Sequence, residues 1–327
     1  MYAEVAMPQE RSVLRIVGWI VLVCVLISER IGASRTLEAL LSEARQFREQ
    51  GKFSQIVVLL GSVDAAQVEG SAGWHNLLGY AYYKLGRYEN SIQEMQTAIR
   101  LDPTKEDFYL DLGELFLEHH ASKAAIALFD VATRRLPHSE KLQFSLALSL
   151  DMQHRRNEAI DLLKALLEKN PSLSEAVHLL GSAMDATLDF DGMLHFMQYI
   201  RQRVPSSSWA WHYEAWARFE LYRQSGYHKP ALEKALSAAL RLNPSAAESH
   251  FLLGKWRAEQ GHLRDAISAL RKSAELDPTN PTVRYQLGQV YRRIGEYALS
   301  DKEFAIRRKL LKEQRETERK TLMIEVH

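Results

Sequence analysis

Apolar residues recur along most of the chain at the three- and four-residue intervals that place side chains on one face of an α-helix. Within residues 106–137 two such runs follow each other, with the apolar members Phe108, Leu112, Leu115 and Phe116, then Ala125, Leu128, Phe129 and Ala132. The polar stretch 119–122 separates the runs. Pro137 ends the second run, because proline lacks an amide hydrogen and its ring collides with the preceding turn. The pattern predicts a helix, a short turn, a second helix and a proline stop.

This two-helix unit recurs with a period of 34 residues. The prolines that close it are Pro103, Pro137, Pro171, Pro205, Pro244 and Pro278, and only the step to Pro244 is longer, at 39 residues. Small residues keep the same phase in the first helix: Gly79, Gly113, Ala147, Gly181, Ala215, Gly254 and Gly288. Large apolar residues keep it in the second helix: Met95, Phe129, Leu163, Met197, Leu236, Leu270 and Phe304. Series that stay in register in this way indicate stacked helical hairpins.

The repeat resembles the tetratricopeptide repeat (TPR) family. Its clearest copy spans residues 74–103 and carries the family's positions at Leu78-Gly79, Tyr82, Gly86, Tyr88, Ala98 and Leu101-Asp102-Pro103. The resemblance covers about residues 37–314 and implies an all-α, right-handed superhelical solenoid of about eight helix-turn-helix repeats. The predicted domains are therefore a targeting segment at 1–33, a TPR solenoid at 34–314, and a charged C-terminal capping helix and tail at 315–327.

The repeat that begins at Ser208 departs from the pattern. It has five extra residues, Glu214 stands where leucine is expected, and Arg218 stands where tyrosine is common. Because both flanking helices stay in phase, the extra residues are predicted to lengthen the turn near 222–230, and Pro230 is predicted to start the second helix. Two interpretations stay open: a locally repacked core with a longer loop, or a partner contact on that loop.

The segment before the repeats predicts export. Arg11 and Arg15 precede residues 16–27, a run of twelve residues without a charge. As a helix this run spans about 18 Å, less than the ~30 Å hydrocarbon core, which favours a secretory signal peptide cleaved near residue 33. An uncleaved anchor that contacts the membrane through residues 13–28, or a buried N-terminal helix, are the alternatives. The basic residues before the run would send the repeats across the membrane.

Composition narrows the function classes. Lysine and arginine number 42 against 41 for aspartate and glutamate, so there is no basic excess for nucleic acid binding. Cys24 is the only cysteine, which excludes disulfides within one chain and cysteine-based metal sites. No phosphate-binding loop, dinucleotide fingerprint, nucleophile elbow or paired zinc motif occurs. His120 and His154 lie one period apart and are interpreted as polar turn residues. We therefore predict no catalysis, no cofactor and no metal.

The TPR resemblance implies that the first helices line a concave groove that binds a protein or peptide segment. The series predicts a lining that includes Asn76, Tyr80, Tyr83, Leu110, Glu114, Phe144, Asp151, His178, Trp216, Phe251, Lys255, Tyr285 and Arg292. Aromatic residues recur among them, and aromatic side chains often anchor interfaces. Some of these positions could instead face packing between helices. The basic clamp of the TPR subgroup that binds C-terminal carboxylates is missing, since Asp107 and Asp111 stand at matching places.

The predicted function is a non-catalytic scaffold for protein–protein interaction in an extracytoplasmic, envelope-associated bacterial complex. The scaffold would be periplasmic, or tethered to the membrane and facing the periplasm. The bacterial assignment follows from the targeting segment and from three asparagines that proline makes unusable for glycosylation: Asn170, Asn243 and Asn280.

Two alternatives from other classes are kept. One is a carbohydrate-binding or sugar-transfer accessory subunit, in which sugars would stack on Trp209, Trp211 and Trp216 beside Asp185 and Glu214. The other is a cytoplasmic TPR regulator, which applies if residues 16–27 are no export signal.

Overall fold

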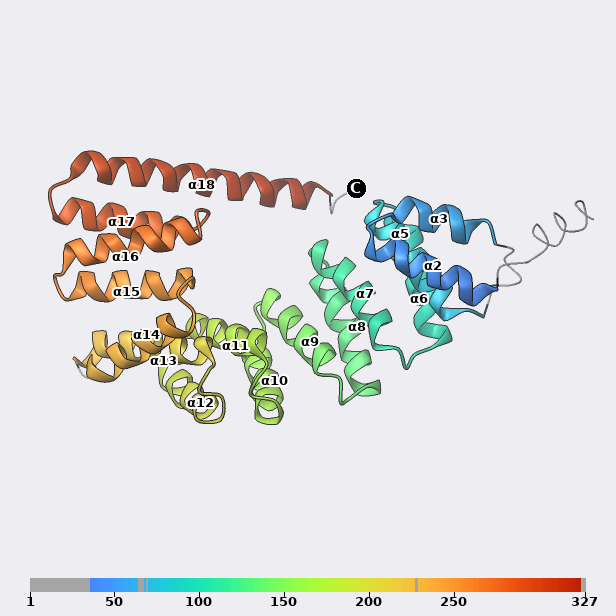
Figure 1. Cartoon of the computed structure of the whole chain (residues 1–327), viewed down its shortest axis with the longest axis horizontal. Coiled ribbons are helices and arrows are strands. Elements are labelled where there is room, and N and C mark those ends of the chain that lie inside the picture. The colour runs from blue at the N-terminus through green and yellow to red at the C-terminus, as the bar shows by residue number, and fades with distance from the viewer. Residues whose placement is uncertain (1–35, 64–67, 69, 227–228, 325–327) are drawn as a thin grey trace, which may run out of the picture. The chain divides into compact units, whose positions relative to one another are not determined.

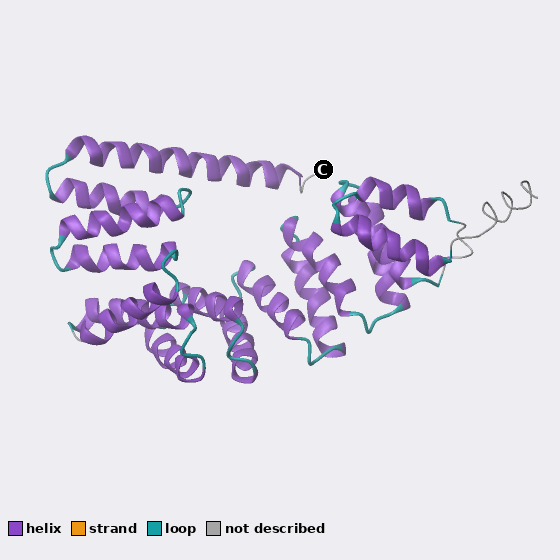
Figure 2. Cartoon of the chain, viewed as in Figure 1, coloured by secondary structure: helices purple, strands orange, loops and turns teal. Residues whose placement is uncertain are grey.

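The computed structural model describes residues 36–63, 68, 70–226 and 229–324, with side chains up to residue 316. This part of the chain forms sixteen helices joined by short loops, and it contains no strand (Figure 2). The predicted targeting segment at 1–33 lies outside the described residues. Within them, no helix combines the length and apolar character needed to cross a membrane. The chain divides after Pro103 into two compact units, which are described separately.

The first unit contains two helical hairpins. Their helices are α2 (Leu37–Glu49), α3 (Phe53–Gly61), α5 (Ala72–Lys84) and α6 (Tyr88–Leu101). The buried core joins one hairpin to the next through Ala44, Ile56, Leu60, Leu77, Leu78 and Ala81. The first repeat, at residues 37–61, is therefore a helical hairpin like the others, although no proline closes it.

The second unit contains six hairpins. Its helices are α7 (Glu106–Glu118), α8 (Ser122–Arg135), α9 (Glu140–Met152), α10 (Arg156–Lys169), α11 (Ser174–Ala186), α12 (Phe190–Arg203), α13 (Ser208–Ser225), α14 (Lys229–Leu242), α15 (Ala247–Glu259), α16 (Leu263–Leu276), α17 (Pro281–Arg293) and α18 (Tyr297–Ile324). Each helix packs on the next, as the row from α15 to α18 shows (Figure 1). The all-α hairpin repeat predicted from the sequence is confirmed.

Each hairpin turns at one residue with a positive φ. These residues are Gly51, Gly86, His120, His154, Leu188, Gly226, Gly261 and Gly295. In the second unit the amide of Ala121 donates to the carbonyl of Phe116 at 2.8 Å, a bond that closes a Schellman motif. His120 and His154 thus hold equivalent turn positions where glycine is usual, which explains their spacing of one period.

The small residues of the first helices allow close approach to the large residues of the second helices. A Cβ atom on Gly113 would lie 2.0 Å from Phe129 Cζ, and one on Gly254 would lie 2.5 Å from Leu270 Cγ. Gly79 and Gly288 make the same contact with Met95 and Phe304. In four repeats, therefore, the two series of the sequence face each other across one hairpin.

Gly181 departs from this arrangement. A Cβ atom there would lie 2.3 Å from Cδ2 of Tyr213, which belongs to α13 of the following hairpin. Gly181 is therefore a site of close approach, as its place in the series of small residues predicts. The side chain that approaches it, however, belongs to the next repeat. The large ring of Tyr213 takes the space that a second-helix residue fills elsewhere.

The extra residues of the irregular repeat lengthen a helix, not a turn as predicted. Helix α13 has 18 residues, whereas α11 and α15 have 13 each. No glycine or proline interrupts it before Gly226, whose φ of 76° ends the helix. Its last turns also gain packing, since the Tyr222 ring meets the Trp256 ring edge-on at 5.0 Å. Helix formation satisfies more backbone groups than a longer loop would.

The last helix runs without a break from Tyr297 to Ile324. The sequence-derived boundary between residues 314 and 315 therefore falls inside α18. Phe304 of α18 packs on Gly288 of α17, and this contact repeats the spacing of the earlier hairpins. The final helix therefore extends beyond the length of the others, and its role as a cap stays a prediction.

Candidate functional site

A pocket opens on the first helices of the second unit, with a volume of about 160 Å³. Its walls come from α11, α13, α15 and the junction between α16 and α17. We call it the aromatic–acidic pocket, and its lining is Ser182, Asp185, His212, Tyr213, Trp216, Ala247, Glu248, Phe251, Ser273, Asp277 and Asn280.

The aromatic wall of the pocket consists of Trp216 and Phe251. Their ring centroids lie 6.4 Å apart with an interplanar angle of 21°. The indole nitrogen of Trp216 donates to Asp185 Oδ1 at 2.6 Å, which ties α13 to α11. The ammonium of Lys255 lies 4.4 Å from the centroid of the Trp216 ring and pairs with Glu220 at 3.3 Å. Side chains of three first helices therefore fix the orientation of one indole.

Two uncharged histidines lie next to the aromatic wall. His212 is buried, its Nδ1 lies 3.0 Å from Ser249 Oγ, and burial lowers the pKa of its imidazole to about 3. Burial also lowers the pKa of His178 and raises the pKa of Tyr213. The Tyr213 hydroxyl and His178 Nδ1 lie within hydrogen-bond distance of each other, at 3.0 Å. The His178 ring also stacks on Trp209 with centroids 3.9 Å apart. At neutral pH neither histidine adds positive charge to the site.

The charged groups of the lining are all carboxylates. Asp185, Glu248 and Asp277 line the pocket, and none of the three forms an ion pair with a described residue. Burial raises the pKa of Asp185, and the hydrogen bond from Trp216 offsets part of this shift. Asp277 Oδ1 accepts from the amide of Thr279 at 3.1 Å, so this carboxylate also shapes the loop after α16. The lining thus carries negative charge without a lysine or arginine of its own.

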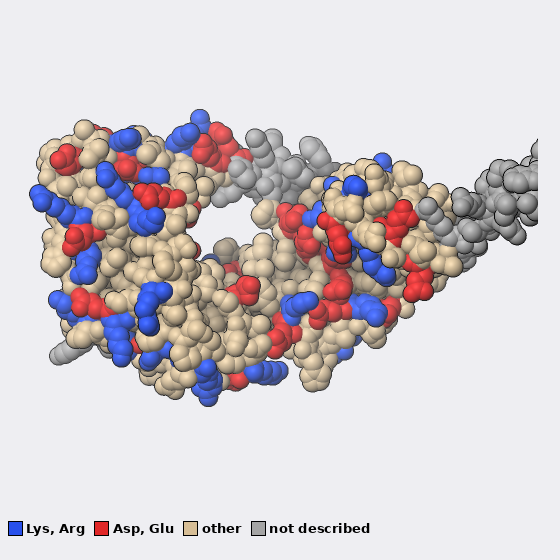
Figure 3. Space-filling model, viewed as in Figure 1, with Lys and Arg blue, Asp and Glu red and all other residues tan. Residues whose placement is uncertain are grey.

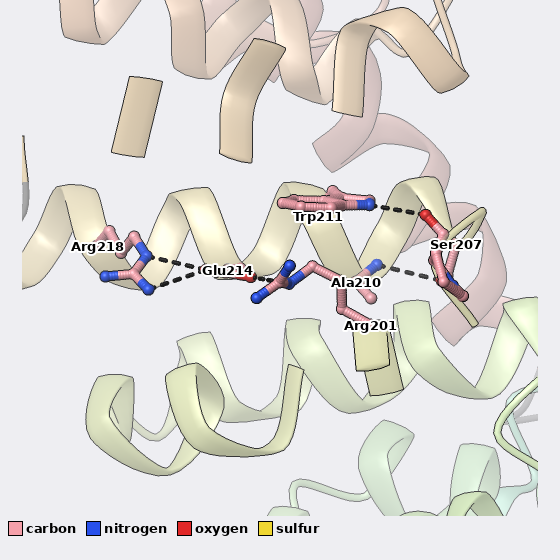
Figure 4. Close-up of polar contacts among 7 residues, drawn as sticks. Arg201, Ser207, Ala210, Trp211, Glu214 and Arg218 are labelled. Carbon is pink, nitrogen blue, oxygen red and sulfur yellow. Dashed lines mark hydrogen bonds and ion pairs between the residues drawn. The ribbon is translucent and has the colours of Figure 1, made fainter. Parts of the chain in front are cut away.

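The unusual Glu214 of α13 is a buried structural charge (Figure 4). Its side chain is 4% exposed and lies between two guanidinium groups. Arg218 Nε and Nη2 donate to Oε1 at 3.0 and 2.9 Å. Arg201 Nε of α12 lies 2.7 Å from Oε2. The two departures noted in the sequence, Glu214 and Arg218, are therefore partners in one ion-pair network.

The three tryptophans of the irregular repeat do not form a single row. Trp209 stacks on His178, whereas the Trp211 ring lies under Arg201, whose Cζ is 4.3 Å from its centroid. The indole nitrogen of Trp211 also donates to the carbonyl of Pro205 at 2.8 Å (Figure 4). Only Trp216 lines the pocket, and Glu214 is buried, so the sugar-stacking arrangement is not formed.

Four of the predicted groove residues lie together. Trp216 and Phe251 line the pocket, Lys255 contacts the Trp216 ring, and His178 bonds to the lining residue Tyr213. These four come from α11, α13 and α15, which are successive first helices of the second unit.

The remaining predicted positions do not line this pocket. In the first unit Asn76 and Tyr83 are buried, and the Tyr80 ring lies 3.7 Å from Arg48 Cζ within the same unit. In the second unit the others are half-buried on α7 and α9 or exposed on α17: Leu110, Glu114, Phe144, Asp151, Tyr285 and Arg292. Asp151 pairs with Arg156 at 3.6 Å, and Arg307 Cζ lies 5.0 Å from the Tyr285 ring. Their part in binding stays a prediction.

Sequence reasoning placed Asp185 in the groove lining, at the phase of Asp151, as well as in the sugar alternative, and it gave Tyr213 and Glu248 no role. Asp185 stands 34 residues after the predicted groove residue Asp151, so the repeat phase contained the signal that identifies it. Tyr213 and Glu248 carried no such signal. Tyr213 joins the pocket through a contact between repeats, and Glu248 joins it from the first turn of α15.

Two further properties concern metal ligands and the distribution of charged side chains. In the part of the chain that the structure describes, no three histidine, cysteine, aspartate or glutamate side chains lie close enough to hold a metal ion. Both positive and negative side chains are present over the face shown in Figure 3, and the net charge of the chain is +1.

Comparison with known proteins agrees with this geometry. The TPR repeat family profile matches residues 79–119 and 256–295. A tetratricopeptide repeat protein from Parabacteroides merdae is 12% identical with a TM-score of 0.54, covering 79% of this chain and 99% of that chain. The C-terminal part of a TPR repeat-containing protein from Cytophaga hutchinsonii is 13% identical with a TM-score of 0.55, covering 76% of this chain and 99% of that chain.

Curated relatives match over shorter stretches. Protein FlbA of Caulobacter vibrioides is 29% identical over 45% of this chain and 25% of its own length. Cell division cycle protein 27 homolog A of Arabidopsis thaliana is 32% identical over 38% of this chain and 17% of its own length. The matched part thus spans a quarter or less of these relatives.

Repeated helical hairpins of 34 residues, with small residues facing large ones and a lined surface on the first helices, define a helical-repeat interaction scaffold. The family-model matches and the fold of these neighbours support a protein of the tetratricopeptide repeat family.

Proposed function

We propose that this TPR scaffold binds a segment of a partner protein across the first helices α11, α13 and α15, with the aromatic–acidic pocket as its anchor point. The observation that carries the proposal is the wall formed by Trp216 and Phe251 (6.4 Å between centroids), fixed by the bond from Trp216 to Asp185. Oriented aromatic rings in a recess are typical of residues that dominate binding energy at interfaces.

The proposal is tested with peptides selected from a random display library on the full-length protein. We expect selected peptides to lose about thirtyfold or more in affinity on Trp216→Ala, because an anchoring tryptophan contributes ~2 kcal/mol or more. The measurement is fluorescence anisotropy of the labelled peptide, on variants whose circular dichroism matches that of the unmodified protein.

Tyr297→Ala is the matched control, because this ring on α18 is 63% exposed and does not line the pocket. It should leave the affinity unchanged. Selected peptides that bind equally well to the Trp216 variant would place binding elsewhere and refute the proposal.

We also propose that the scaffold works outside the cytoplasm in a bacterial envelope complex, as a cleaved or membrane-tethered protein. The support is the sequence of residues 11–27, where two arginines precede an uncharged run. A fusion of the full chain to alkaline phosphatase, which folds only after export, should be active in a bacterial host. An inactive fusion, with the full-length protein in the cytoplasmic fraction, would favour the cytoplasmic alternative.

A further inference from the structure

We propose that the aromatic–acidic pocket receives the cationic side chain of an arginine or lysine in the partner segment. This inference rests on the proposed function and specifies the chemistry of its anchor point. Three features of the pocket support it independently: its charge, its aromatic wall and an unpartnered hydroxyl.

The charge of the lining favours a cation. Asp185, Glu248 and Asp277 contribute three carboxylates, and none is neutralised by an ion pair within the described chain. The histidines add no opposing charge, since burial keeps His212 neutral. Lys255 is a basic residue beside the pocket whose charge acts on Asp185, but its ammonium forms its ion pair with Glu220, at 3.3 Å. An anionic or apolar side chain would leave these carboxylates without a counter-charge.

The aromatic wall attracts cations as well. The face of an indole carries negative potential, and a cation within about 6 Å of its centroid is stabilised. The protein itself shows this interaction, because the ammonium of Lys255 lies 4.4 Å from the Trp216 centroid and 5.8 Å from that of Phe251. A guanidinium or ammonium in the pocket would meet aromatic rings and carboxylates together.

A buried hydroxyl supplies a hydrogen-bond acceptor. Ser273 lines the pocket from α16 and is 1% exposed, yet its Oγ forms no hydrogen bond with a described residue. A buried hydroxyl without a partner is costly, and an N–H donor of a bound side chain would satisfy it. The volume of about 160 Å³ lies below the ~300–1,000 Å³ of small-molecule sites, so it suits one side chain.

The experiment titrates the full-length protein with three acetylated and amidated pentapeptides, Gly-Gly-Xaa-Gly-Gly, in which Xaa is arginine, lysine or glutamine. The readout is the indole N–H resonance of Trp216 in protein labelled with nitrogen-15, assigned by its loss in Trp216→Phe. We expect the arginine and lysine peptides to shift this resonance with a dissociation constant of about 1–10 mM, the range for a cation–π contact combined with a hydrogen bond to a carboxylate. The glutamine peptide should leave it in place.

Carboxylate variants test the charge argument. Glu248→Gln should weaken binding of the cationic peptides by about threefold or more, and added salt should reduce that difference. Glu296→Gln is the matched control, because this exposed glutamate does not line the pocket and should leave the affinity unchanged. The inference would be overturned if the glutamine peptide shifted the resonance as much as the cationic peptides do. It would also be overturned if neither cationic peptide shifted it at a concentration tenfold above the expected dissociation constant.

The outcomes for the two proposals are distinguishable. Library peptides that depend on Trp216 but lack a preferred basic position would uphold the proposed function and overturn the cationic pocket. Cationic pentapeptides that bind while no library peptide depends on Trp216 would uphold the pocket and refute its role as an anchor for protein segments. Unequal affinities of the arginine and lysine peptides would identify which cation the pocket prefers.

Discussion

Glu214→Ala is expected to lower the free energy of unfolding by about 3–5 kcal/mol, the cost of breaking a buried ion pair by removing one partner. The carboxylate accepts two hydrogen bonds from Arg218 and lies 2.7 Å from Arg201 Nε, and its side chain is 4% exposed (Figure 4). Without it, two guanidinium groups with side chains 28% and 13% exposed would lose the carboxylate that they share. Urea denaturation followed by circular dichroism measures the loss.

Glu158→Ala is the control for the loss of one glutamate. Its ion pair with Arg155 is as short, at 2.6 Å, but the two side chains are 57% and 47% exposed. Solvent screens such pairs, so this variant should unfold at nearly the same urea concentration as the unmodified protein. A similar loss in the Glu158 and Glu214 variants would contradict the assignment of Glu214 as a buried network charge.

Residues of the types found in the regular repeats should restore most of the stability that Glu214→Ala loses. Glu214→Leu combined with Arg218→Tyr and Arg201→Met replaces the network by apolar groups, and such replacements are often close to neutral, within about 1–2 kcal/mol. A triple variant as unstable as Glu214→Ala would show that the space around position 214 does not accept the regular core. That outcome would assign the loss to packing and not to charge.

Much of the fold could be predicted because several residue series agree at every repeat. The approach of Gly113 to Phe129, and of Gly254 to Leu270, follows from two series that stand 16 residues apart in the sequence. The phase identified the residues that meet in these hairpins but not the contact of Gly181, and it did not predict the conformation of the extra residues. Helix α13 continues to Ser225, because nothing stops it before Gly226.

The candidate site was less predictable, because it depends on contacts between repeats. Trp216 and Phe251 could be placed by phase and residue type alone. The contact of Tyr213 with Gly181 could not, since it depends on the size of a ring in the next hairpin. The partners of the charged groups also could not be derived from the sequence. It does not show that Lys255 pairs with Glu220, or that Asp185 accepts a hydrogen bond from Trp216.

The second large loss of stability is expected for a substitution at the contact between the two helices of one hairpin. In Gly113→Ala the new Cβ would lie 2.0, 2.6 and 2.8 Å from three atoms of the Phe129 ring, far inside van der Waals contact. Phe129 is 1% exposed, so its ring cannot move aside without displacing core neighbours. We expect a net loss of about 2–3 kcal/mol in the free energy of unfolding, even though alanine favours helix by ~1 kcal/mol.

The repeat that follows shows which second substitution should relieve this clash. It carries Ala147 where Gly113 stands and Leu163 where Phe129 stands, and both are fully buried. Gly113→Ala combined with Phe129→Leu reproduces that pair, so it should recover at least about half of the loss of the single variant, a coupling of ~1 kcal/mol or more. Gly61→Ala is the matched control, because a Cβ on this helical glycine of α3 meets nothing within 4 Å and should not destabilise the protein. Losses that simply add in the double variant would mean that position 113 and the Phe129 ring do not compete for one space, and the pairing of the two series across the hairpin would then be wrong.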